Sequence, residues 1–157
     1  MNKLKASFSG IMNFKPAKIY WWIVIILAFT PVLYFSYLFI SVKDFSANWL
    51  KTLQANPEVS IMFIISLVDL MLSYYLWQFH ENIVDNKPAL KNIYLVLLFF
   101  QTILGNIFMI FLSGMGLYKL KSMTRISVQK PQGLSLTLIL VSIIYAFCGF
   151  MMWRIYF

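Results

Sequence analysis

Long apolar segments separated by short polar ones dominate the pattern of this chain. A helix rises about 1.5 Å per residue, so crossing a hydrocarbon core of about 30 Å takes about 20 apolar residues. Four segments meet that requirement: residues 19–42, 59–79, 93–118 and 134–153. The pattern therefore predicts an all-α fold, namely a polytopic integral membrane protein whose residues 1–157 form a single bundle of four transmembrane helices with short loops.

Two of the polar segments carry apolar residues at helical spacing. Residues 3–14 place apolar side chains between lysines, and residues 44–55 repeat an aromatic or leucine residue every four positions. Such amphipathic segments are typical of helices that lie in the membrane surface, so we predict two interfacial helices. The polar segment 80–92 is expected to be a loop that Pro88 interrupts.

An acid lies at the centre of the second span. Asp69 is the eleventh residue from Val59, which places it near the membrane midplane. An ionised carboxylate there costs about 2.5–3.5 kcal/mol on insertion scales, so such a group usually faces the bundle interior with a partner or takes up a proton. Ser66 and Ser73 share its helix face. One interpretation is a site for a proton, a cation or a cationic substrate. The other is a protonated packing group whose interhelical hydrogen bond contributes about 1 kcal/mol.

The other three spans also carry a polar or helix-breaking residue near their midpoints. In the first span, Thr30 is expected to help satisfy the carbonyl that Pro31 frees. We expect Asp69 to accept a hydrogen bond from Asn106 or Gln101. The resulting polar layer, acting either as a ligand-binding site or as interhelical contacts, consists of Asp69, Ser66, Ser73, Asn106, Gln101, Thr30 and Tyr145.

Composition supports a membrane protein, because 61% of the residues are hydrophobic, 11% are charged and the mean hydropathy is +0.78. These values exclude a disordered chain or an ordinary soluble domain. The formal charge of +8 comes from lysines and arginines in short polar segments, which favours contact with the lipid bilayer and not with nucleic acid. The most basic segment is 119–133, and its predicted lipid-headgroup contacts are Lys119, Lys121, Arg125 and Lys130.

Four spans would place both termini on one side of the membrane. That side would collect seven lysines and arginines and the other side six, which is almost no positive-inside bias. Four basic residues precede the first span and two follow it, so cytoplasmic N- and C-termini are predicted. Residue usage rich in Lys, Ile and Asn favours a bacterial cytoplasmic membrane. The near-equal counts leave dual insertion open, as in small antiparallel transporter dimers.

Enzyme motifs are absent from the sequence: it has no P-loop, no dinucleotide fingerprint, no G-x-S-x-G and no H-E-x-x-H. His80, Glu81 and Asp85 are possible metal ligands, but three such residues in a polar loop more often face solvent and bind no metal. The lone Cys148 permits no intramolecular disulfide. We therefore expect no cofactor, no metal and no catalytic activity.

The function expected from these features is partner binding by a non-enzymatic membrane protein, as an accessory subunit, a regulator or an immunity-type protein. The partner would be another membrane protein or a second copy of this chain. One alternative is a small proton- or cation-coupled transporter or channel that uses Asp69, and another is a protein that binds lipid or a small hydrophobe. The size and the four predicted spans resemble those of small multidrug-resistance transporters. Those transporters rely on an acid in the first span, where this chain has none.

Overall fold

The computed structural model of the protein describes residues 16–41, 51, 53–123, 131 and 133–156. Regular structure in these residues is entirely helical. The predicted interfacial helix 3–14 lies outside the described residues. Most of the predicted helix 44–55 does too, although Lys51 and residues 53–55, which are described, are helical.

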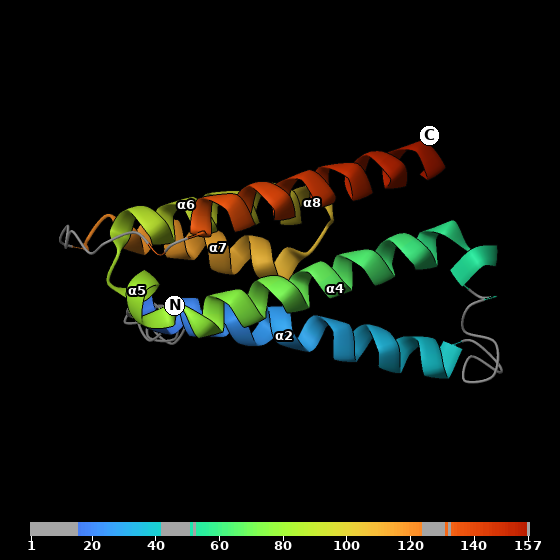
Figure 1. Ribbon diagram of the computed structural model, residues 1–157, viewed down its shortest axis with the longest axis horizontal. Helices are drawn as coiled ribbons and strands as arrows, with labels where there is room; N and C mark the ends of the chain where they lie inside the picture. Colours follow the sequence, from blue (N-terminus) through green and yellow to red (C-terminus); the bar gives the residue numbers. More distant parts are fainter. Residues whose placement is uncertain (1–15, 42–50, 52, 124–130, 132, 157) are drawn as a thin grey trace, which may run out of the picture.

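The elements follow one another as α2 (Pro16–Ser41), α4 (Pro57–Gln78), α5 (His80–Val84), α6 (Lys87–Ile103), α7 (Ile107–Leu120) and α8 (Leu134–Tyr156) (Figure 1). Three of these helices, α2, α4 and α8, are long and apolar enough to cross a membrane. They correspond to the first, second and fourth predicted spans. The described structure is therefore all-helical, with three helices that could span a membrane.

The prediction of a third continuous span over residues 93–118 is wrong, because that segment folds as a hairpin of two helices. Helix α6 has 17 residues and α7 has 14, which correspond to lengths of about 25 Å and 21 Å. Each is shorter than a typical hydrocarbon core of about 30 Å. The two helices pack side by side, so the hairpin starts and finishes at the same end of the molecule (Figure 1).

Three residues form the turn of this hairpin, and we call Leu104, Gly105 and Asn106 the hairpin tip. Gly105 has a φ of +75°, the left-handed conformation that ends many helices. The N–H of Asn106 donates to the Gln101 carbonyl at 2.9 Å, and the N–H of Gly105 donates to the Thr102 carbonyl at 3.3 Å. This pair of bonds is the Schellman motif. Asn106 then caps α7, since its Oδ1 accepts from the N–H of Met109 at 3.3 Å.

The α6–α7 hairpin packs along only one half of the length of α2, α4 and α8. At that end, α2 packs against α4 and α7, α8 packs against α4 and α6, and α6 packs against α7, so these five helices surround a common interior. In the other half only α2, α4 and α8 continue, with α4 between the other two (Figure 1). Helices α2 and α8 make no close backbone contact in the described residues.

Hydrogen bonds fix which helix ends lie together. At the hairpin end, the Tyr94 hydroxyl of α6 donates to the Pro16 carbonyl of α2 at 3.3 Å. At the opposite end, the Tyr156 hydroxyl of α8 donates to Glu58 of α4 at 2.5 Å. Helix α2 therefore begins at one end of the molecule and α8 finishes at the other (Figure 1). Four antiparallel spans would instead have brought the start of α2 and the end of α8 to the same end of the bundle.

The polar segment after α4 also differs from the predicted loop, because it contains α5 and the first residues of α6. Pro88 lies in the first turn of α6, where its missing N–H is no loss. Asn86 is the N-cap, and its side chain accepts from the N–H of Ala89 at 3.0 Å. Proline therefore starts a helix here instead of interrupting a loop.

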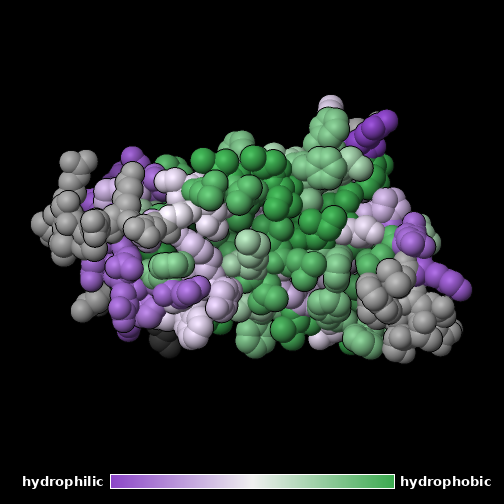
Figure 2. Space-filling view, in the orientation of Figure 1, coloured by the Kyte–Doolittle hydropathy of each residue, from purple (hydrophilic) through white to green (hydrophobic). Residues whose placement is uncertain are grey.

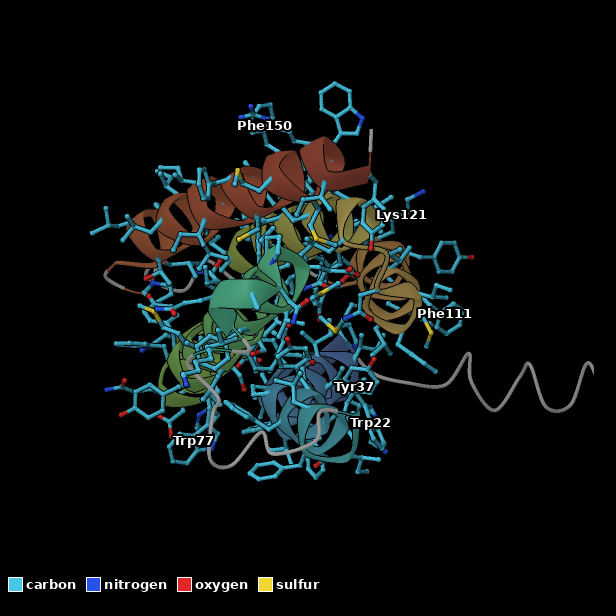
Figure 3. All side chains as sticks on the ribbon, turned by 90° about the vertical axis from the view of Figure 1, so that its right-hand side faces the viewer. Trp22, Tyr37, Trp77, Phe111, Lys121 and Phe150 are labelled. Atoms are coloured by element: carbon cyan, nitrogen blue, oxygen red, sulfur yellow. The ribbon has the colours of Figure 1, made fainter. Side chains whose placement is uncertain are left out.

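The outer surface is apolar around the middle of the molecule and polar at its two ends (Figure 2). Viewed along the long axis, the large side chains labelled in Figure 3 project outward from the helices. Trp22, Trp77, Phe111 and Phe150 are each at least half exposed. An apolar belt of this kind is the surface expected of helices in contact with lipid.

Candidate functional site: a buried acid beside the hairpin tip

Asp69 is held between three helices in the interior of the bundle. Its side chain on α4 is 1% exposed. The Tyr145 hydroxyl of α8 donates a short hydrogen bond to Asp69 Oδ1, and Gln101 Nε2 of α6 donates to the same oxygen at 3.3 Å. The Tyr145 ring also packs on Phe100, with ring centroids 5.8 Å apart. The hydrogen bond between Asp69 and Gln101, one of the two predicted, is thus present.

The chemistry of this cluster is that of an acid with two neutral donors. Both bonds converge on Oδ1, and Oδ2 accepts no hydrogen bond from the described residues. No described Lys, Arg or His forms an ion pair with Asp69. A carboxyl group in such a place can gain or lose a proton, and its two donors link α4, α6 and α8.

The other predicted members of the polar layer make separate contacts. Ser66 donates to the Phe63 carbonyl of its own helix at 2.8 Å. Ser73 donates to the Val24 carbonyl at 2.8 Å, which ties α4 to α2. The Thr30 hydroxyl donates to the Ile26 carbonyl at 2.9 Å and not to the Leu27 carbonyl that Pro31 frees. The structure therefore gathers three of the seven predicted residues at Asp69 and leaves these three apart.

Asn106 is the seventh, and its role differs most from the prediction. It does not hydrogen-bond Asp69, because its side chain caps α7. The sequence signal for this role was Gly105 followed by Asn106, a helix-ending glycine next to a helix-starting asparagine. The prediction of one continuous span over residues 93–118 instead made Asn106 a hydrogen-bond donor to Asp69.

The hairpin tip lies close to Asp69, between the two ends of the long helices and not at either end. Gln101, which contacts Asp69, is only one helical turn before Gly105. By contrast, Pro57, where α4 begins, is twelve residues from Asp69, or about 18 Å along the helix. At the tip, α6 also meets α8, since a methyl group on Gly149 would lie 2.8 Å from Cγ2 of Ile103. The tip is thus near the middle of α4 and α8.

The tip itself is open on its outer side. Gly105 is exposed, and Ile107 and Phe108 just after it are 76% and 77% exposed. No hydrogen bond within the described residues reaches the carbonyls of Leu104 or Gly105. These two carbonyls and the exposed apolar side chains form a surface that combines unpaired backbone groups with large hydrophobic residues.

The remaining predicted sites lie at the hairpin end. Lys119 is in the last turn of α7 and Lys121 follows it, exposed, whereas Arg125 and Lys130 lie outside the described residues. His80 Nδ1 lies 2.8 Å from the Trp77 carbonyl. In the described part of the chain, no three His, Cys, Asp or Glu residues come together in a way that could hold a metal ion.

Comparisons with protein-family models, with curated proteins and with solved structures find no match to this chain, so its function has to be argued from the geometry of the acid and the hairpin.

Proposed function

We propose that α2, α4 and α8 cross the membrane and that the α6–α7 hairpin enters and leaves on the side where α2 begins. This arrangement is supported by the distribution of basic residues. With three crossings, ten of the thirteen lysines and arginines fall on the N-terminal side; the other three, on the opposite side, are Lys43, Lys51 and Arg154. Four crossings would have divided them seven to six. A ratio of ten to three is a strong positive-inside bias, so the N-terminus is cytoplasmic and the C-terminus is on the other side.

Cysteine labelling from outside intact cells tests this arrangement. In a Cys148→Ala background, Arg154→Cys should react with a membrane-impermeant maleimide, whereas Lys91→Cys and Lys121→Cys should react only after the membrane is opened. Four spans with cytoplasmic termini predict the reverse for Lys121 and Arg154. Placement of Lys91 and Lys121 on opposite sides would refute the hairpin.

The function that the geometry supports best is binding to another membrane protein. The main support is the hairpin tip, whose backbone carbonyls and neighbouring apolar side chains are exposed. In this arrangement the tip lies within the hydrocarbon. Non-helical backbone at that depth is tolerated only where protein covers it or a water-filled cavity reaches it, because each unpaired carbonyl costs several kcal/mol in lipid. Lipid tails can cover Ile107 and Phe108 but cannot donate hydrogen bonds to Leu104 and Gly105. A polar group from a partner's membrane helix can.

Site-specific photo-crosslinking tests partner binding at the tip. A photoreactive residue in place of Phe108 should give a protein adduct in native membranes. The matched control is Phe147, which is 60% exposed and lies within the regular helix α8. It should give lipid adducts only. Protein adducts at both positions, or at neither, would refute a specific contact at the tip.

A second candidate, a proton- or cation-coupled transporter, is favoured by Asp69. The acid lies beside the tip, where a water-filled cavity is the alternative to a partner. In that case Gly105→Cys would react with a water-soluble maleimide, and Asp69→Asn would abolish transport while preserving the fold. Carboxyl infrared absorption, with Asp69→Asn as the control, shows whether the acid changes protonation state. A carboxyl band that is unchanged at every accessible pH would exclude this candidate.

A further inference from the structure

The hairpin tip carries unpaired hydrogen-bond donors as well as unpaired acceptors. The carbonyls of Leu104 and Gly105 accept no hydrogen bond from the described residues. Asn106 uses only its side-chain oxygen to cap α7, and its Nδ2 donates no hydrogen bond to the same part of the chain. An asparagine amide has two N–H donors. The tip therefore presents two acceptors and two donors to the molecule that covers it.

The surface around these polar groups is apolar and uncharged. Ile107 and Phe108 are 76% and 77% exposed. Phe111, one turn further along α7, projects outward in Figure 3. Residues 92–118 contain no Asp, Glu, Lys or Arg. The first basic residue after the tip is Lys119, in the last turn of α7 and about 18 Å from Ile107 along the helix. Charge repulsion therefore does not oppose the meeting of two identical tips.

A second copy of the chain can supply the groups that the tip lacks. Two copies inserted in the same direction and related by a twofold axis along the membrane normal have their tips at the same depth. A twofold interface is self-complementary, because each contact from one copy to the other is made twice. The Asn106 amide of each copy can then donate to the Leu104 or Gly105 carbonyl of the other. A regular membrane helix has its backbone groups paired internally, so it would need both a donor and an acceptor side chain at this depth.

We propose that the hairpin tip is the interface of a parallel homodimer, in which the tips of two copies pack against each other across a twofold axis. This inference rests on the proposed partner binding at the tip, and it identifies the partner as a second copy of this chain. Hydrogen bonds from the two Asn106 amides cross the axis, and Ile107 and Phe108 of both copies exclude lipid from them. Asp69 and its two donors take no part in the interface.

Two copies with different affinity tags, expressed together, test the identity of the partner. With a photoreactive residue in place of Phe108, the adduct in native membranes should carry both tags and have about twice the chain mass of 18.4 kDa. Mass spectrometry of the digested adduct should place the cross-link within residues 104–111 of the second copy. Protein adducts that never contain the second tag overturn the homodimer but not partner binding. The absence of any protein adduct refutes partner binding itself.

Energy transfer between donor- and acceptor-labelled copies in phosphatidylcholine vesicles measures the contribution of the amide. Asn106→Ser keeps an oxygen that can cap α7 but removes the amide donor. One interhelical hydrogen bond strengthens association about fivefold. The twofold axis makes two such bonds, so the variant should dimerise about thirtyfold more weakly.

The matched control is Asn86→Ser, which changes the asparagine cap of α6 at the other end of the hairpin. It should dimerise like the wild-type protein. Circular dichroism in the same vesicles checks that both variants are folded. Equal weakening by the two variants, or no weakening by Asn106→Ser, overturns the proposal.

Discussion

Gly116 of α7 packs against Tyr94 of α6 and has no room for a side chain. A methyl group there would lie 2.7–2.9 Å from three ring atoms of Tyr94 on α6. The Tyr94 ring cannot move away easily, because it is fully buried and its hydroxyl donates to the Pro16 carbonyl. Gly116→Ala must therefore separate α6 from α7. Gly114, two residues before Gly116, has no atom within 4 Å of an added methyl group and provides the matched control.

The expected effects follow from two opposing contributions. Replacing glycine by alanine within a helix stabilises it by about 0.5–1 kcal/mol. Gly114→Ala should show this gain alone. Inserting a methyl group into a packed interface costs about 1–3 kcal/mol, so Gly116→Ala should lower the free energy of unfolding by about 1–2 kcal/mol. The two variants should then differ by about 1–3 kcal/mol, with opposite signs relative to the wild-type protein.

Reversible unfolding of the purified protein in mixed micelles, followed by circular dichroism, measures this difference. Tyr94→Ala provides a further check, since it removes the ring and should make the second substitution, Gly116→Ala, nearly harmless in the double variant. Equal stability of Gly114→Ala and Gly116→Ala would refute the close hairpin. A single continuous helix over residues 93–118 would give that result, because both glycines would then lie within one apolar span.

Five further substitutions, at four positions, test the turn and the buried polar groups. Tyr145→Phe removes a donor to Asp69 and should cost about 1 kcal/mol in the same unfolding assay; no loss would mean that the hydrogen bond does not form in the membrane. Gly105→Ala should cost about 1–2 kcal/mol because of its positive φ, and Gly105→Asn should cost clearly less. Ser113 Oγ is buried without a hydrogen-bond partner in the described residues, so Ser113→Ala should be neutral or stabilising. By contrast, Ser73→Ala loses the bond to α2 and should cost about 1 kcal/mol. Equal effects of the two serine variants would contradict this assignment.

Hydropathy was sufficient to locate the three helices that are long enough to cross a membrane, because α2, α4 and α8 each coincide with one predicted apolar segment. It failed at residues 93–118, where the three residues of the tip are too few to lower the average over a span. The local chemistry was informative, since Gly105 followed by Asn106 is both a stop and a start signal. Under the proposed arrangement, one crossing fewer also changes the side assigned to every basic residue after the hairpin.

The hydrogen-bond partners of Asp69 were partly predictable from their expected depth in the membrane. Tyr145 was predicted because it lies near the middle of a span, and Gln101 as an alternative donor to Asn106; both do contact the acid. Depth alone could not separate them from Thr30 or Asn106, which lie at similar positions but bond to their own helices. Which face of a helix meets which neighbour depends on packing, and one sequence without relatives gives no direct information on packing.

The buried acid has a consequence for how the chain is made. Asp69 leaves the ribosome 32 residues before Gln101 and 76 residues before Tyr145. Helix α4 therefore enters the bilayer while its carboxyl group has neither donor. The insertion cost of about 2.5–3.5 kcal/mol is offset by its apolar residues, which each contribute about 0.3–0.6 kcal/mol. Until α8 is synthesised, this carboxyl lacks the hydrogen bond from Tyr145. We expect proteases of the membrane to recognise a chain that exposes such an unpaired polar group. Chains that end before α8 should be degraded faster in a pulse–chase experiment, and Asp69→Leu should lengthen their lifetime.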